Sequence, residues 1–102
     1  MNVVWSIYAQ ERVMEIALRI SGQNMLAAEE WVNNIFDKAK ILASFPNMGR
    51  KVPELRRTDV RELLFGDYRI IYHSSELTQQ ATVLTVRHVK QLLPIDEIKK
   101  QI

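Results

Sequence analysis

One run of nine residues, Phe65 to His73, restricts most strongly how this chain can fold. Its last six residues, Tyr-Arg-Ile-Ile-Tyr-His, are mostly β-branched or aromatic and contain no glycine or proline, which predicts a strand. Gly66-Asp67 is a turn signal, and the run Val60 to Phe65 predicts a second strand, so the two should form a tight hairpin. A third strand, Ala81 to His88, follows a polar connection. We expect an antiparallel meander of three strands.

Two helices are predicted ahead of the meander, each by a stripe of apolar residues at helical spacing. The first should run from Gln10 to Ser21, with Gly22 in the left-handed conformation that often ends a helix. Asn24 can cap the second, which should run to about Ser44 before Pro46 stops it. Because few residues separate the helices, they should pack as an antiparallel hairpin.

Three shorter segments complete the predicted fold. Val3 to Tyr8 is an apolar run long enough for one strand, Pro46 to Glu54 should be an irregular connection, and Ile95 to Lys100 should form a short last helix. This order predicts a single α+β domain over residues 1–102, in which the N-terminal strand pairs with the meander. The helical hairpin should cover one face of the sheet and leave the other face open.

The residue types present exclude several classes of protein. The chain has no cysteine, only two histidines and no HExxH, Walker-type, GxGxxG or GxSxG motif, so we expect no metal and no small-molecule cofactor. No apolar run is long enough to span a membrane, and the N-terminus lacks the basic and then apolar layout of a signal peptide. We therefore expect a cytoplasmic protein with no membrane partner.

Positive charge is concentrated in the second half of the chain. Residues 1–49 carry four basic and five acidic side chains, a net charge of −1, whereas residues 50–102 carry ten basic and seven acidic, a net charge of +3. Such a surplus suits a nucleic acid or an acidic protein segment. A solvated loop and strand edge is the alternative, and the sequence leaves it open. The candidate binding residues are Arg50, Lys51, Arg56, Arg57, Arg61 and Arg87.

Arg69 interrupts a strand that is otherwise built for burial, so its guanidinium should be paired or should face a cleft. If the neighbouring tyrosines meet the helices, strand alternation points Arg69 to the open side of the sheet. The alternative is a structural ion pair, for example with Glu62 on the adjacent strand. Arg87 and His88 end the third strand, one on each face, and either could lie near Arg69. A histidine there suits acid or base chemistry.

The order and spacing of these motifs resemble the RelE/ParE superfamily of bacterial type II toxins. After the N-terminal strand and the helical hairpin, the similar segments are Leu-x-x-x-Pro-x-x-Gly-Arg over Leu42 to Arg50, then Val60 to Leu63, Tyr68 to Tyr72 and Val83 to His88. The resemblance implies a small toxin encoded beside a cognate antitoxin, which neutralises it by wrapping an otherwise disordered segment over its surface.

The superfamily divides into ribosome-dependent mRNA endonucleases, on the RelE side, and inhibitors of DNA gyrase, on the ParE side. The resemblance to the nucleases implies Arg69 on the phosphate and Glu54 as base, with His88 as the available acid. The long helical hairpin and the Leu42 to Arg50 junction look more like the ParE branch. We therefore expect a gyrase inhibitor without catalytic residues. The alternatives are a metal-independent endonuclease acting on the ribosome with mRNA, and a degenerate toxin that only binds its antitoxin.

Overall fold

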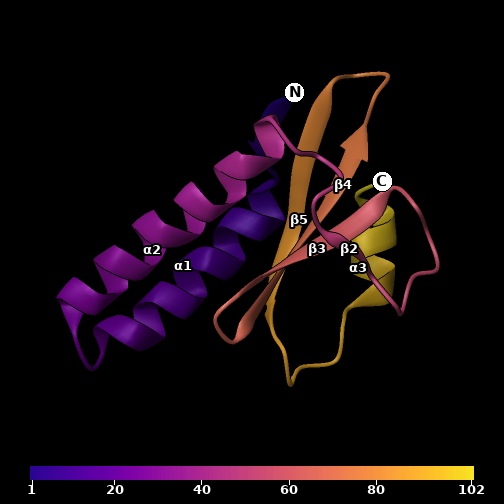
Figure 1. Cartoon of the computed structure of the whole chain (residues 1–102). Coiled ribbons are helices and arrows are strands. Elements are labelled where there is room, and N and C mark those ends of the chain that lie inside the picture. The colour runs from indigo at the N-terminus through magenta and orange to yellow at the C-terminus, as the bar shows by residue number, and fades with distance from the viewer.

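A five-stranded sheet forms the centre of the computed structural model, which describes residues 1–102 (Figure 1). The order across the sheet is β1-β5-β4-β3-β2, and all neighbours are antiparallel except β1, which pairs in parallel with β5. The last three strands in the chain are the predicted meander, which is confirmed. The strands are β1 (Asn2–Trp5), β2 (Arg50–Lys51), β3 (Val60–Phe65), β4 (Tyr68–Ser75) and β5 (Gln80–His88).

The two long helices form the predicted hairpin, although the first begins earlier than expected. α1 spans Ile7–Ser21, because the Ser6 side chain accepts a hydrogen bond from the Ala9 N–H at 3.0 Å and caps the helix there. The predicted strand Val3 to Tyr8 therefore ends at Trp5. Asn24 caps α2 (Met25–Ala39) as predicted, and the 3-10 helix η1 (Lys40–Ala43) continues it.

The glycines show which turns need a residue without a side chain. Gly66 has a φ of 55° in the β3–β4 turn, where glycine is favoured. Gly22 has a φ of −60° and simply continues the right-handed turn of α1, so the predicted left-handed conformation is wrong. Gly49 is needed for space, since a Cβ atom there would lie 2.6 Å from the Glu62 carbonyl oxygen.

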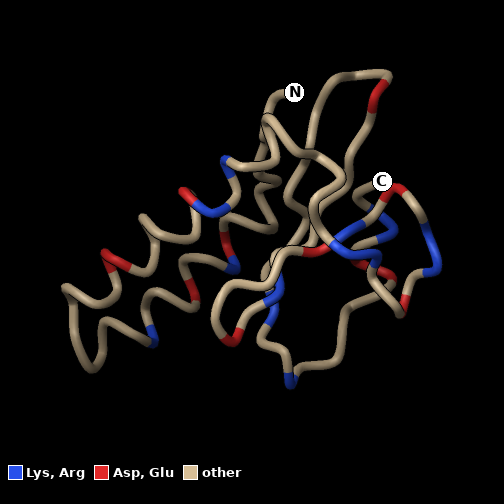
Figure 2. The backbone as a smooth tube through the Cα atoms, in the orientation of Figure 1, with Lys and Arg blue, Asp and Glu red and all other residues tan.

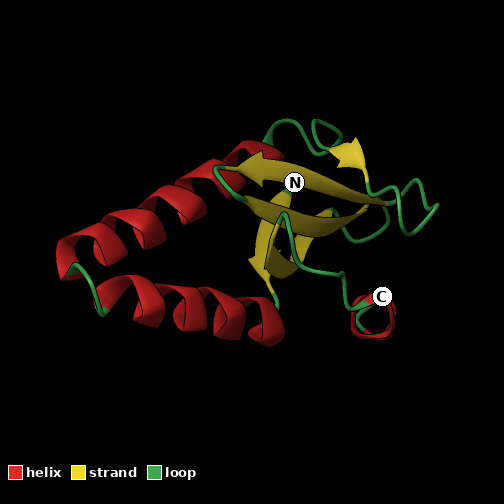
Figure 3. Cartoon of the chain, turned by 90° about the horizontal axis from the view of Figure 1, so that it is seen from below, coloured by secondary structure: helices red, strands yellow, loops and turns green.

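The helical hairpin packs on one face of the sheet and forms the larger core. Val13, Ile16 and Ile35 from the helices meet Ile70 and Tyr72 from β4, and all are essentially inaccessible to solvent. The tyrosine face of β4 thus meets the helices, which is the condition under which Arg69 was expected on the other face of the sheet. Figure 3 shows the hairpin projecting from one side of the sheet, with the C-terminal helix α3 (Ile95–Lys100) on the other.

The second face of the sheet, opposite the hairpin, is not open as expected. Val60, Ile71 and Leu84 place apolar side chains on it, and Val52, Leu55 and Ile98 pack over them as a second core. The covering residues come from the connection after β2 and from α3, two short segments with no long apolar stripe. A bulge at Leu84, opposite the Ile71/Tyr72 step of β4, brings this leucine into the second core. None of the helices is both long and apolar enough to cross a bilayer.

Candidate functional site

Arg69 lies at the centre of a network of charges on the second face. β4 directs its guanidinium toward two carboxylates: Nε donates to Glu62 Oε1 at 2.8 Å, while Nη1 and Nη2 donate to the two oxygens of Glu54 at 2.8 and 2.9 Å. Glu62 Oε2 also accepts from Arg50 Nε at 2.6 Å. The result is a chain of four alternating charges that joins β2, β3, β4 and the connection after β2.

The two central charges of this network are buried, whereas the side chains of Arg50 and Glu54 at its ends are 60% and 40% exposed. Arg69 is 7% exposed and Glu62 is 1% exposed, so neither charge can be solvated by water. The hydrogen bond from Arg69 lowers the pKa of the Glu54 carboxyl, and the bonds to Glu54 and then Glu62 raise the pKa of Arg69. The N–H groups of Arg69 that face the carboxylates already donate hydrogen bonds to them. A phosphate could therefore reach the guanidinium only by displacing Glu54.

His88 lies on the opposite face from Arg69. It pairs across the β4–β5 ladder with Tyr68, and the two rings meet edge to face with centroids 5.5 Å apart. Its Nδ1 accepts from the Lys90 N–H at 3.1 Å. The structure thus brings Glu54 and Arg69 together and separates His88 from both.

Arg87 is the residue directly across the ladder from Arg69. Its Nη2 donates to the hydroxyl of Tyr8, and its guanidinium carbon lies 5.8 Å from the centre of the Tyr8 ring. Tyr8 reaches this position because α1 starts where β1 ends, beside the last residues of β5. Arg87 makes no ion pair with a carboxylate, unlike Arg69.

The basic residues between 50 and 61 differ in whether their side chains are already paired within the protein or are free to bind a partner. Arg57 binds both oxygens of Asp59, at 2.9 and 2.8 Å, and this contact lowers the pKa of Asp59 to about 2. Arg61 donates to the Gly49 carbonyl at 2.9 Å. Lys51 and Arg56 are exposed and form no ion pair. Figure 2 shows these basic residues gathered around β2 and the loop that follows it. Their role in binding stays a prediction.

Tyr72 fixes the loop that leads from η1 to β2, a role that the sequence did not predict. This fully buried side chain donates from its hydroxyl to the Pro46 carbonyl at 2.7 Å and accepts from the Gly49 N–H at 3.0 Å. Burial raises the pKa of the hydroxyl, which keeps it protonated and able to donate.

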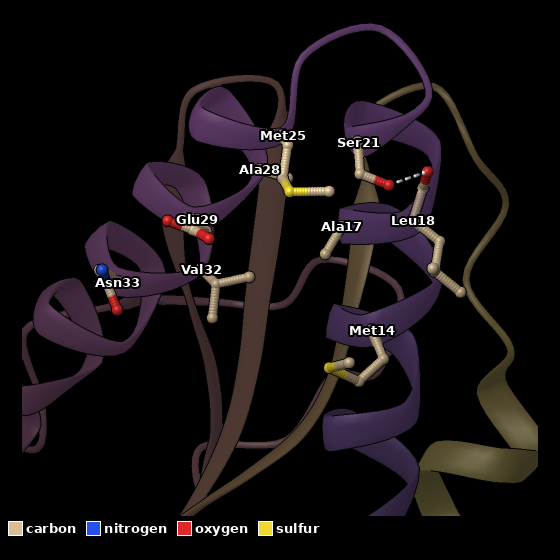
Figure 4. Close-up of a pocket in the computed structure, with 9 residues that line it drawn as sticks. All are labelled: Met14, Ala17, Leu18, Ser21, Met25, Ala28, Glu29, Val32 and Asn33. Atoms are coloured by element: carbon tan, nitrogen blue, oxygen red, sulfur yellow. Dashed lines mark hydrogen bonds between the residues drawn. The ribbon is translucent and has the colours of Figure 1, made fainter.

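An apolar groove runs between α1 and α2 on the surface of the hairpin (Figure 4). It has a volume of about 500 Å³, and Met14, Met25 and Val32 point into the space between the helices. Leu18 and Glu29 also line it. No three His, Cys, Asp or Glu side chains in the structure are grouped so that they could hold a metal ion.

A family model for the ParE toxin of the type II toxin–antitoxin system parDE matches residues 3–93. The chain belongs to the ParE toxin family. No curated protein sequence is a significant match to this ParE-family toxin.

Two solved structures share the fold of the toxin. The chromosomal ParDE toxin–antitoxin system of P. aeruginosa matches with a TM-score of 0.72 and 18% identity, over 86% of this chain and 95% of that chain. The toxin–antitoxin complex RelBE2 of Mycobacterium tuberculosis matches with a TM-score of 0.61 and 18% identity, over 85% of this chain and 95% of that chain. The resemblance to the RelE/ParE superfamily is confirmed.

Two site features of this ParE-family toxin that the sequence did not predict depend on contacts between distant segments. Glu54 was a candidate base, but nothing in its neighbours along the chain indicated that it holds Arg69. Met14, Leu18 and Met25 are apolar positions outside the buried helical stripes, and this was the available signal for the groove.

Proposed function

We propose that this toxin arrests growth by inhibiting DNA gyrase in the cytoplasm, and that it does not cleave mRNA. The observation that supports the proposal is that the guanidinium of Arg69 is not free, although a nuclease would need it to bind the phosphate. Its guanidinium is buried and engaged by two carboxylates, and His88 lies on the other face of the sheet.

The physical reason is that metal-independent RNA cleavage needs a base, a phosphate-binding cation and an acid around one scissile bond. Glu54 and Arg69 neutralise each other here, and the bidentate geometry favours the closed pair. Family membership supports the ParE activity over the RelE activity.

The test is to titrate purified toxin into a supercoiling reaction with gyrase and relaxed plasmid, and in parallel into a reconstituted translation reaction with end-labelled mRNA. We expect loss of supercoiling and intact mRNA. His88→Gln should inhibit gyrase as well as the unmodified toxin, because His88 has no catalytic task in this mechanism. Cuts within ribosome-bound codons that disappear in His88→Gln would establish the endonuclease instead.

The partner that neutralises the toxin is a cognate antitoxin that lays the apolar side chains of one segment into the α1–α2 groove. Met14, Leu18 and Met25 are exposed there although they are large and apolar. The structural neighbours from P. aeruginosa and M. tuberculosis are toxin–antitoxin systems. The sheet face that was expected to be open is already covered by Val52, Leu55 and Ile98.

Calorimetric titration of the antitoxin at low and high salt tests the groove. Leu18→Glu should weaken binding by at least about tenfold, because it places a carboxylate in an apolar contact. Leu77→Glu, at an exposed leucine far along the chain in the β4–β5 turn, is the matched control and should leave binding unchanged. Apolar contact also predicts little dependence on salt. Strong salt dependence with loss of binding in Lys51→Ala would place the antitoxin on the basic segment.

A further inference from the structure

We propose that the loop Phe45-Pro46-Asn47-Met48, called here the 45–48 tip, is the surface with which the toxin contacts its target protein. The side chains of Phe45 and Met48 are 60% and 56% exposed, although they lie only three residues apart. With Ser44, the tip surrounds a shallow hollow of about 460 Å³. Two large apolar side chains beside a hollow are typical of a contact surface.

The tip is held rigidly from inside the molecule. The Tyr72 hydroxyl binds the Pro46 carbonyl and the Gly49 N–H, at 2.7 and 3.0 Å. The Met48 N–H closes a turn on the Phe45 carbonyl at 3.1 Å. A loop that only connects two elements does not require a buried tyrosine and a glycine to fix its conformation. A loop that contacts a partner binds more tightly when it is ordered before binding.

The charge of the segments that flank the tip along the chain indicates the chemistry of the partner. Residues 38–53 contain four basic side chains and no acidic one. Two of the four, Lys40 and Arg50, form ion pairs with Asp37 and Glu62, while the other two, Lys38 and Lys51, are exposed and unpaired. The fitting partner is therefore a protein surface with an apolar pocket for Phe45 and carboxylates at its rim. Two free cations are few for a nucleic acid, whose binding depends on many phosphate contacts.

The 45–48 tip and the antitoxin groove are separate surfaces. No residue lines both, since the groove is lined by residues between Met14 and Asn33. Changes at the tip should therefore reduce action on the target and leave antitoxin binding intact. This inference rests on the proposed function, because it names the surface with which a gyrase inhibitor would bind the enzyme.

The experiment compares Phe45→Asp and Met48→Asp with Leu77→Asp and Leu92→Asp, whose leucines are 96% and 93% exposed and do not line the hollow. Each variant is assayed for growth arrest after induction at equal soluble level, for inhibition of gyrase supercoiling, for antitoxin affinity and for melting temperature. We expect the two tip variants to need at least about tenfold more toxin for half inhibition. Their antitoxin affinity and melting temperature should match those of the two controls, since all four side chains are exposed.

Each outcome separates the inference from the proposed function. If the unmodified toxin inhibits gyrase and the tip variants inhibit it equally, the inference is wrong and the function stands. If gyrase is unaffected but tip variants lose growth arrest, the inference stands and the target is another protein. Loss of antitoxin affinity in the tip variants, or binding of the tip to DNA alone, would overturn the inference. A chain without any toxicity would overturn both.

Discussion

Replacing Arg69 with alanine should destabilise the toxin by about 3 to 4 kcal/mol, near the middle of the range for breaking a buried ion pair. Most of this loss comes from Glu62, which is 1% exposed and would keep only the contact from Arg50 Nε at 2.6 Å. Glu54 contributes less, because its side chain is 40% exposed and water can replace the guanidinium. A loss of this size is a large share of the roughly 5–15 kcal/mol that stabilises a domain.

Urea unfolding of three variants tests this reasoning. Glu54→Gln should lose no more than about 1 kcal/mol, as expected for a pair open to solvent. The double variant Arg69→Met, Glu62→Leu should recover most of the Arg69→Ala loss, because it removes both buried charges together. An Arg69→Ala protein that keeps full stability and loses toxicity would refute the structural role and restore Arg69 as a phosphate-binding residue.

Three further predictions concern the loop, the glycines and pH. Tyr72→Phe should destabilise the toxin by about 2 kcal/mol in urea unfolding, because the buried Gly49 N–H loses its acceptor; an unchanged midpoint would contradict this. Gly49→Ala should cost about 1–3 kcal/mol through overpacking, whereas Gly22→Ala, with its nearest neighbour at 3.5 Å and a negative φ, should be neutral or stabilising. The pKa of Asp59 falls from 3.8 to about 2 on folding, so its contribution to stability is complete above the higher value and is lost as the pH falls toward the lower one. In Asp59→Asn, the urea unfolding midpoint should therefore depend less on pH over that interval.

The features that the sequence predicted are those with local causes. The meander follows from β-branched runs broken by Gly66-Asp67, and α2 follows from the Asn24 cap and an apolar stripe. The α1 boundary was missed because Val3 to Tyr8 has no breaker, and only the hydrogen bond from the Ala9 N–H to the Ser6 side chain decides where the helix begins.

The other features that the sequence missed depend on contacts between distant segments. Val52, Leu55 and Ile98 cover the second face of the sheet from two short segments. Neither segment is long enough to show the repeating apolar spacing from which a buried face could be predicted. The Arg69–Glu62 pair was named as an alternative because both residues lie on predicted adjacent strands, and it is confirmed. The bond from Arg69 to Glu54 was not predicted, since Glu54 lies in an irregular connection whose path over the sheet is set by tertiary packing.

The pairing of β1 with β5 sets a limit on when a newly made chain can become a toxin. Asn2 to Trp5 form the first strand of the sheet along the chain, whereas their partners, Gln80 to Val83, belong to the last strand. In the folded sheet β5 is the only neighbour of β1 and lies between it and β4. The first strand therefore meets its native partner only after the other strands have been synthesised, as is typical of folds with long-range strand pairing. A fragment cut short before Gln80 would lack the partner of its own N-terminus.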